Sequence, residues 1–219
     1  SDLSVIEICR NKIKTSEFFD NNKIGSPKLI TEKEILNKEY KFPLFIKPLN
    51  GSSSINAFKI NTEKELEFFN EYIENSMIQE CIEGKEFTID VFVDFEGNPI
   101  TIVPRERIAT RSGEILKGKI FKDRELIDEA LKVIEILKPI GHITLQCMKT
   151  KEGVKFIEIN PRFGGGAPMS IKAGANSPLN LYKILKGEKL EYNENYRENI
   201  LALRFDDCIF INENGEVLK

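Results

Sequence analysis

The chain has 219 residues, of which 41% are hydrophobic and 31% charged, and its formal net charge at pH 7 is −3. This balance is typical of a soluble globular protein with one large domain or two small lobes, and the negative charge argues against a nucleic-acid partner. Because no apolar run approaches the roughly 20 residues of a membrane helix, the sequence predicts no membrane partner either.

Cysteine and histidine are sparse. The single histidine is His142, and the four cysteines form no CxxC pair, which argues against a metal finger or a disulfide framework. We interpret the cysteines as reduced, buried thiols of a cytoplasmic protein and His142 as a structural residue. The chain starts with Ser1 and has no signal-peptide pattern, so we expect it to be part of a longer gene product. The cysteines are Cys9, Cys81, Cys147 and Cys208.

The first third of the chain predicts a small lobe of mixed helices and strands. Residues 10–19 are predicted to form a helix, and a short strand follows over 27–30. Thr31, with Glu34 three residues later, predicts a helix start with a capping box. The further elements expected in this part are strands over 43–48 and 57–60 and a helix over 62–75.

From residue 77 the pattern favours strands. A turn at 96–99 predicts a hairpin, and apolar residues at helical spacing predict a helix over 123–137 that Pro139 ends. The other expected elements are strands over 77–81, 86–95, 100–107, 142–149 and 154–160 and helices over 167–173 and 178–186.

The strand over 154–160 carries the most informative pattern. Since alternate side chains of a strand face opposite sides, Ile157 and Ile159 are expected to point into the core, whereas Glu158 and Asn160 share the other face. Carboxylate and amide oxygens are ligands that Mg²⁺ prefers. The alternative is a half-exposed strand with ordinary polar residues on its wet side.

Residues on both sides of this strand extend the pattern. Arg162 follows it, and a guanidinium neutralises phosphate oxygens. Gln146 on the preceding strand is expected beside Glu158 as a supporting ligand. The glycines at 164–166 favour a site, because they allow the backbone to approach a ligand closely.

Two lysines stand out earlier in the chain. Lys47 ends an apolar strand before the loop at 50–54, where its ammonium could reach a nucleotide phosphate. Ser52 and Ser53 in that loop offer hydroxyls and backbone N–H groups to the same anion. A solvated strand end is the alternative for Lys47, and Lys12 is a weaker candidate. Neither a Walker A nor a Rossmann glycine pattern occurs.

A connector over 79–86 could present backbone groups to an adenine edge, with Glu80 or Glu83 near the amino group or the ribose. A charged hairpin connection is the alternative. Further along, three arginines favour anion handling, although a surface charge cluster is also open. They are Arg105, Arg107 and Arg111, of which the first two are expected to share a strand face.

In this order the motifs resemble the ATP-grasp superfamily, within it the carbamoyl-phosphate-synthetase-like and amino-acid ligase branch, over residues 10–187. Residues 158–162, Glu-Ile-Asn-Pro-Arg, resemble its metal and phosphate strand E-[IMV]-N-P-R. Residues 45–48 resemble the strand with its phosphate-binding lysine, and residues 80–86 its adenine-binding hinge. Residues 104–114 resemble the segment that shapes the reaction centre.

The resemblance implies an α+β ATP-grasp fold with ATP and Mg²⁺, or Mn²⁺, between two lobes. It implies an N-terminal helix over 1–23, a small lobe over 24–76 and a large lobe over 77–219. The family's preceding Rossmann-like domain is absent from this chain, and we expect it in the same polypeptide.

The implied activity is that of a ligase that phosphorylates a small carboxylate substrate and passes the acyl phosphate to an amine acceptor. An ATP-binding module without catalysis and a kinase-like phosphotransferase are the alternatives. Oligomeric state stays open. The implied catalytic residues are Arg162, Lys47, Arg105 and Arg107; the ATP-binding residues are Lys12, Lys47, Ser52, Ser53, Glu80, Cys81, Ile82, Glu86 and Arg111; the metal ligands are Glu158, Asn160 and Gln146.

Overall fold

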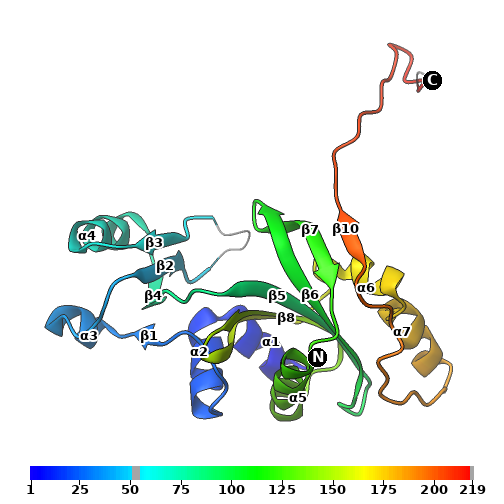
Figure 1. Ribbon diagram of the computed structural model, residues 1–219, viewed down its shortest axis with the longest axis horizontal. Coiled ribbons are helices and arrows are strands. Elements are labelled where there is room, and N and C mark those ends of the chain that lie inside the picture. The colour runs from blue at the N-terminus through cyan, green and yellow to red at the C-terminus, as the bar shows by residue number, and fades with distance from the viewer. Residues whose placement is uncertain (51–54, 218–219) are drawn as a thin grey trace.

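The computed structural model describes residues 1–50 and 55–217, so Ser52 and Ser53 lie outside the described residues. Within this part of the chain, two antiparallel sheets form the frame (Figure 1). The smaller sheet has the order β1-β4-β2-β3, with β1 Leu29–Ile30, β2 Leu44–Pro48, β3 Phe58–Ile60 and β4 Ser76–Glu80. The larger has the order β10-β7-β6-β5-β8-β9, with β5 Lys85–Val93, β6 Pro99–Arg111, β7 Glu114–Ile120, β8 Gly141–Thr150, β9 Gly153–Asn160 and β10 Leu201–Leu203.

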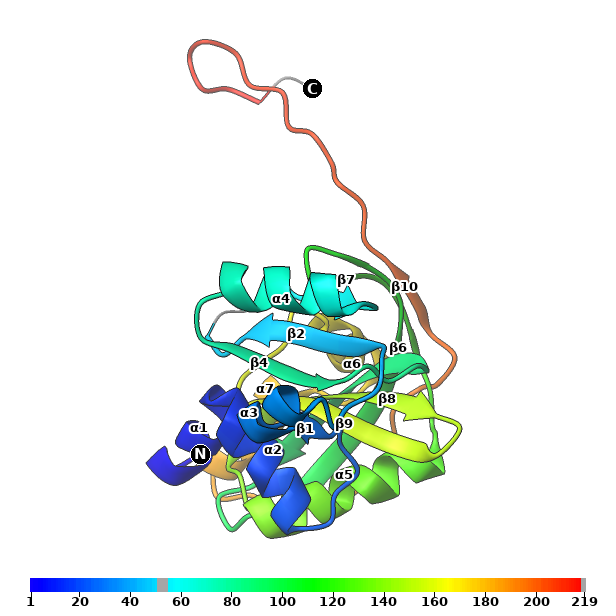
Figure 2. The same cartoon turned by 90° about the vertical axis from the view of Figure 1, so that its left-hand side faces the viewer.

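The small sheet is accompanied by two helices, α3 (Glu32–Asn37) and α4 (Glu63–Tyr72), and Figure 2 shows α4 lying along β2 and β4. Helix α3 begins with the predicted capping box, in which Thr31 Oγ1 accepts from Glu34 N–H and the Glu34 carboxylate accepts from Thr31 N–H. The core of this lobe consists of buried aliphatic side chains. They include Leu44, Ile46, Ile60, Leu66 and Ile78.

Strand β4 differs from its expected assignment. The sequence pattern places residue 77 at the start of the large lobe, but β4 lies between β1 and β2 in the small sheet. Its register with β2 runs from Leu44 opposite Glu80 to Pro48 opposite Ser76. The alternation of residues along a strand does not encode which strand it pairs with, and in this sheet β4 joins the edge strand β1 to β2.

One face of the large sheet packs on helices. Buried Ile89 of β5 and Leu145 of β8 belong to the same core cluster as residues of α5 (Arg124–Leu137). The same cluster includes residues of α1 (Leu3–Arg10) and α2 (Lys12–Asn21), and Figure 1 shows all three helices beneath this sheet. The pattern predicts one helix over 10–19. The structure has a break at Asn11, whose side chain caps α2 by accepting from the N–H groups of Ile13 and Lys14.

The other face of the large sheet is divided. At one end it is covered by α6 (Ala167–Ala173), with α7 (Ser177–Leu185) beside it (Figure 1). Val103 and Ile115 pack there against Met169 and Ala173 of α6. The rest of this face looks toward the small sheet.

Strands β7 and β10 have no counterpart among the predicted elements. A tight turn connects β6 to β7, with Ser112 at φ +50° and Gly113 at φ +74°, the left-handed conformations of a two-residue hairpin. Strand β10 pairs with β7 and leads into residues 204–217, which project away from the body (Figures 1 and 2). In that segment Phe205, Ile209 and Phe210 are exposed.

The four cysteines are free thiols, but they are not uniformly buried as expected. Cys9 and Cys147 lie in the core of the large lobe. Cys81 is half-buried, and Cys208 is exposed on the projecting C-terminal segment. Across residues 1–50 and 55–217, no helix has both the length and the apolar character needed to cross a membrane.

Candidate active site

A cavity of about 430 Å³ lies where the small sheet faces the large one. Its apolar lining comes from both sheets, with Phe45 and Ala57 on the side of the small sheet and Met148 and Ile157 on the side of the large sheet. Ile82, in the connector between the sheets, lies at the same cavity. These side chains form a slot suited to a flat apolar group.

The position of Ile157 corrects the simple alternation expected for β9. Gln146 pairs with Glu158, but the next pair is Cys147 with Phe156, so Ile157 is the extra residue of a β-bulge. Phe156 and Ile159 are buried, whereas Ile157 is only half-buried and lines the cavity. The bulge therefore puts Ile157 and Glu158 at the same cavity.

The three expected metal ligands lie on neighbouring strands. Gln146 of β8 is opposite Glu158 of β9, and Asn160 follows two residues later at the end of β9. The Gln146 amide donates from Nε2 to Glu86 Oε1 at 2.6 Å. A carboxylate only accepts, so the amide nitrogen must face Glu86, and Oε1 of Gln146 is left as an acceptor for a cation.

Arg107 supports this arrangement from one strand further away. Its Nε lies 2.9 Å from Glu86 Oε1, and its Nη2 donates to Gly113 O at 2.9 Å. Arg107 therefore holds the carboxylate that orients Gln146, and it is not among the residues that line the cavity. Glu86, which the sequence predicts near the ribose, already contacts Gln146 and Arg107 through Oε1.

Two lysines meet Glu158 at the polar end of the cavity. Lys47 is only 9% exposed, and burial lowers the pKa of its ammonium to about 8, with Glu158 opposing this shift and the charge of Lys12 adding to it. Burial also lowers the pKa of Lys12, again against the effect of Glu158. Lys12 Nζ donates to Leu49 O at 3.0 Å. Two desolvated ammonium groups beside one carboxylate favour binding of a further anion.

A second cavity, of about 1100 Å³, adjoins the first and shares Lys12, Ile157 and Glu158 with it. Asn160 and the exposed Arg162 line this second cavity. Of the expected site residues, Lys12 and Glu158 thus line both cavities, whereas Lys47 and Gln146 line only the first and Asn160 and Arg162 only the second.

The connector between the sheets lines the first cavity. Its residues there include the predicted Glu80, Cys81, Ile82 and Glu86. Part of its backbone is already used, because Cys81 N–H donates to Pro43 O at 3.2 Å and Glu80 N–H to Lys28 O at 2.9 Å. Burial raises the pKa of the Cys81 thiol, so this side chain is not a thiolate at neutral pH.

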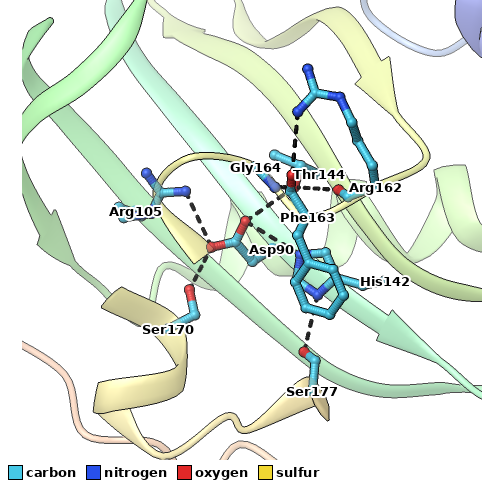
Figure 3. A network of polar contacts seen from close by, with 9 residues as sticks. All are labelled: Asp90, Arg105, His142, Thr144, Arg162, Phe163, Gly164, Ser170 and Ser177. Carbon is cyan, nitrogen blue, oxygen red and sulfur yellow. Dashed lines mark hydrogen bonds and ion pairs between the residues drawn. The ribbon is translucent and has the colours of Figure 1, made fainter. Parts of the chain in front are cut away.

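None of the three arginines, Arg105, Arg107 and Arg111, is among the residues that line the two cavities. Arg105 is 1% exposed and pairs with Asp90 at 3.1 Å (Figure 3). Arg111 is exposed and forms two contacts with Asp206, at 2.6 and 2.7 Å. Arg105 and Arg107 do reach partners on the same strand β5, but the structure does not bring the three guanidiniums to one anion.

The glycine run has a different role from the expected one. A Cβ on Gly166 would lie 2.0 Å from Arg105 Nη1, so this position needs glycine to admit the arginine and not a ligand. The sequence reasoning also missed Lys59, Gln79 and Met148, which line the first cavity. Lys59 lies two residues after Ala57, which also lines this cavity. Because residues two apart in a strand share a face, this spacing was the signal that could have found Lys59.

An apolar slot, a buried and a half-buried lysine, and side-chain oxygens between two antiparallel sheets are the features of a two-lobed nucleotide-binding domain. The family model described as "ATP-grasp in the biosynthetic pathway with Ter operon" matches residues 72–206, and the model "D-ala D-ala ligase C-terminus" matches residues 13–121. The chain belongs to the ATP-grasp family of ligases, which confirms the predicted superfamily and the α+β fold.

Individual relatives agree with this assignment. D-alanine–D-alanine ligase B of Clostridium perfringens is 27% identical over 174 residues, which cover 70% of this chain and 57% of that protein. The biotin carboxylase domain of 2-oxoglutarate carboxylase from Hydrogenobacter thermophilus, solved with MgADP and bicarbonate, superposes with a TM-score of 0.76 at 19% identity, covering 90% of this chain and 50% of that one. L-amino acid ligase from Bacillus licheniformis gives a TM-score of 0.63 at 21% identity, covering 76% and 44%. The chain thus spans little more than half of the curated relative.

Proposed function

We propose that the chain is the ATP-binding catalytic region of a ligase that phosphorylates a carboxylate with Mg·ATP and passes the acyl phosphate to an amine. The observation that carries this proposal is that Lys12 and Glu158 line both cavities, while Lys47 lines the first and interacts electrostatically with both of them. One buried and one half-buried ammonium group beside side-chain oxygens fit a metal-bound polyphosphate better than any neutral ligand.

The adenine ring is placed in the apolar slot of the first cavity. Cys81 O and the Ile82 backbone are assigned to its edge, because Cys81 N–H already donates to Pro43 O. Glu80 is the carboxylate assigned to the ribose or amino group, since Glu86 is engaged by Arg107 and Gln146. The phosphates then extend toward Lys47 and Lys12.

The donor set at the polar end fits Mg²⁺. Gln146 Oε1, Glu158 and Asn160 are hard oxygen ligands, and Mg²⁺ is commonly held by one or two carboxylates together with substrate phosphates. Among the described residues no group of three His, Cys, Asp or Glu side chains could hold a metal on its own, which fits a site completed by the nucleotide. Mn²⁺ accepts the same ligands. When bound, the ion neutralises negative charge on the phosphates.

The reaction needs no protein nucleophile. An oxygen of the substrate carboxylate attacks the γ-phosphorus, the bond to the β-γ bridging oxygen breaks, and ADP leaves. The neutral amine then attacks the acyl carbon, phosphate leaves as the C–N bond forms, and the proton that the nitrogen loses passes to the departing phosphate or to solvent. Lys12, Lys47 and Arg162 offset the charge on the transferred phosphoryl group, and such positioning and electrostatic stabilisation dominate phosphoryl transfer.

The carboxylate is assigned to the second cavity, which Arg162 lines. The names of the D-alanine–D-alanine ligase and L-amino acid ligase relatives support an amino acid or a short peptide as substrate. A further domain of the same polypeptide is proposed to complete the acceptor site. Use of ATP and free cysteines fit a cytoplasmic location.

The test combines calorimetry with an ADP-release screen over amino acids, bicarbonate and short peptides. We expect the wild type to bind Mg·ATP and to release ADP when an acceptor is present. Arg162→Ala should abolish both binding and ADP release, and Glu158→Gln should abolish ADP release. Glu152→Gln, an exposed carboxylate in the turn of the same hairpin, is the matched control. Unchanged turnover in both site variants refutes the proposal, and binding without ADP release for any acceptor supports a non-catalytic module.

A further inference from the structure

Thr144 stands at the centre of the contacts in Figure 3. It lies on β8, only 4% exposed, with Asp90 opposite it on one side and Asn160 on the other. Asp90 is 2% exposed and accepts from Arg105 Nη2 at 3.1 Å and from Ser170 Oγ at 2.5 Å. Burial alone would raise the pKa of Asp90, but the charge of Arg105 and the other polar contacts lower it. The carboxylate therefore stays an acceptor.

The Thr144 hydroxyl reaches the turn that carries Arg162. It lies 3.2 Å from Asp90 Oδ1 and 3.2 Å from Arg162 O, and it accepts from Gly164 N–H at 3.2 Å. Since a hydroxyl has one proton and two lone pairs, it donates to one of these oxygens while Gly164 occupies a lone pair. The approach is close, because a Cβ on Gly164 would lie 3.1 Å from this hydroxyl.

Phe163 adds a second attachment of the same turn. Its ring stacks on His142, with centroids 4.1 Å apart and planes inclined by 12° (Figure 3). His142 Nδ1 lies 3.0 Å from Ser177 Oγ at the start of α7. Directly after the predicted metal strand ends, Phe163 and Gly164 are therefore attached to β8, and Arg162 O lies within hydrogen-bond distance of the same Thr144 hydroxyl.

We propose that Thr144 is a positioning residue for the phosphate site, whose hydroxyl holds residues 162–164 against Asp90 and thereby directs Arg162 and the end of β9. Thr144 is not among the residues that line the two cavities, so it acts through Arg162 and Asn160. The proposal rests on the function assigned above, in which these two residues handle the Mg·ATP phosphates.

Three variants isolate the hydroxyl. Thr144→Val removes it and keeps the branched shape, and Thr144→Ser keeps it. Thr88→Val is the matched control, because Thr88 is buried on the adjacent strand and its hydroxyl has no hydrogen-bond partner within the described residues. Thermal unfolding of each variant establishes that it is folded.

Amide hydrogen exchange over residues 161–166 tests the attachment without any nucleotide. We expect exchange about fivefold faster in Thr144→Val, the effect of one lost hydrogen bond, with rates near wild type in Thr144→Ser and Thr88→Val. Unchanged exchange in Thr144→Val overturns the proposal, and so does an equal acceleration in all strands of the large sheet.

Kinetics separates this proposal from the proposed function. With an acceptor from the screen, Thr144→Val should lower kcat about tenfold or more and raise KM for ATP only about fivefold. A misplaced contact costs more in the transition state than in the bound ground state, and Thr144→Ser should restore both values. A kcat of Thr144→Val equal to that of the wild type would overturn the proposal that Thr144 is a positioning residue. If the full-length wild-type polypeptide releases no ADP with any acceptor, the proposed function fails, and Mg·ATP affinity decides the positioning role instead. About fivefold weaker binding in Thr144→Val supports that role, and equal binding overturns it.

Discussion

One face of the large sheet is covered by α6 at one end and faces the small sheet at the other, and charged side chains of both signs lie at both ends. Their surroundings differ. Where α6 covers the sheet, Arg105 and Asp90 lie 3.1 Å apart and are almost fully buried. Where the small sheet faces it across a cavity, Lys47 has a pKa lowered to about 8 in spite of nearby Glu158. The covered end satisfies its charges internally, whereas the open end keeps positive charge that an anion from solution can stabilise. This difference supports the proposal that the open end is the functional one.

The largest expected effect comes from breaking the covered pair. Arg105→Met leaves the Asp90 carboxylate buried without its main partner, and removing one member of a buried pair costs about 3–5 kcal/mol. The free energy of unfolding, measured by urea titration, should fall by that amount. A loss below about 1 kcal/mol would mean that this end tolerates an isolated charge and that the contrast with the open end is wrong.

Removing a charge at the open end should have the opposite pattern. Lys47→Met takes a desolvated ammonium away, so stability should stay equal or rise, while Mg·ATP affinity in calorimetry falls about 10- to 100-fold, the effect of a charged hydrogen bond. Lys41→Met, an exposed lysine just before the same strand, is the control. A large loss of stability in Lys47→Met with unchanged affinity would assign Lys47 a structural role.

The sequence identified the open end better than the covered one. Local residue order and spacing predict the strand that ends in Glu158 and Asn160 and the place of Lys47 before a loop. The capping box at Thr31 is predicted from the same kind of local signal. The partner of Arg105 could not be predicted, because Asp90 reaches it only through the register of β5 with β6.

Pairing and irregularity also limited the prediction of the fold. The bulge at Ile157 breaks the alternation of two that β9 was expected to follow. The place of β4 in the small sheet and the short edge strand β10 depend on partners distant in sequence. The alternation of residues along a strand predicts which side chains share a face of that strand, but it does not predict which strands pair with it.

The pH dependence should separate binding from stability. The folded-state pKa of Lys47, about 8, lies below its ordinary value of 10.5, so between these pH values the unfolded chain binds more protons than the folded one. The cost of the buried charge is therefore fully present below pH 8 and is relieved as pH rises toward 10.5. Unfolding free energies of wild type relative to Lys47→Met should rise from pH 7 to 9.5, while Mg·ATP affinity of wild type falls. A difference that is flat with pH would show that Lys47 has an ordinary pKa.

The smallest effect is expected at Arg111. The Arg111–Asp206 contacts lie on the surface at the tip of the β6–β7 hairpin, and exposed pairs contribute little to stability. Arg111→Ala should leave both the melting temperature and Mg·ATP affinity within error, in contrast to Arg162→Ala. Gly113, two residues after Arg111, lines the first cavity, so affinity is the informative measurement. If Arg111→Ala weakens Mg·ATP binding while Asp206→Ala strengthens it, the guanidinium exchanges its surface partner for phosphate, and the open end includes the hairpin tip.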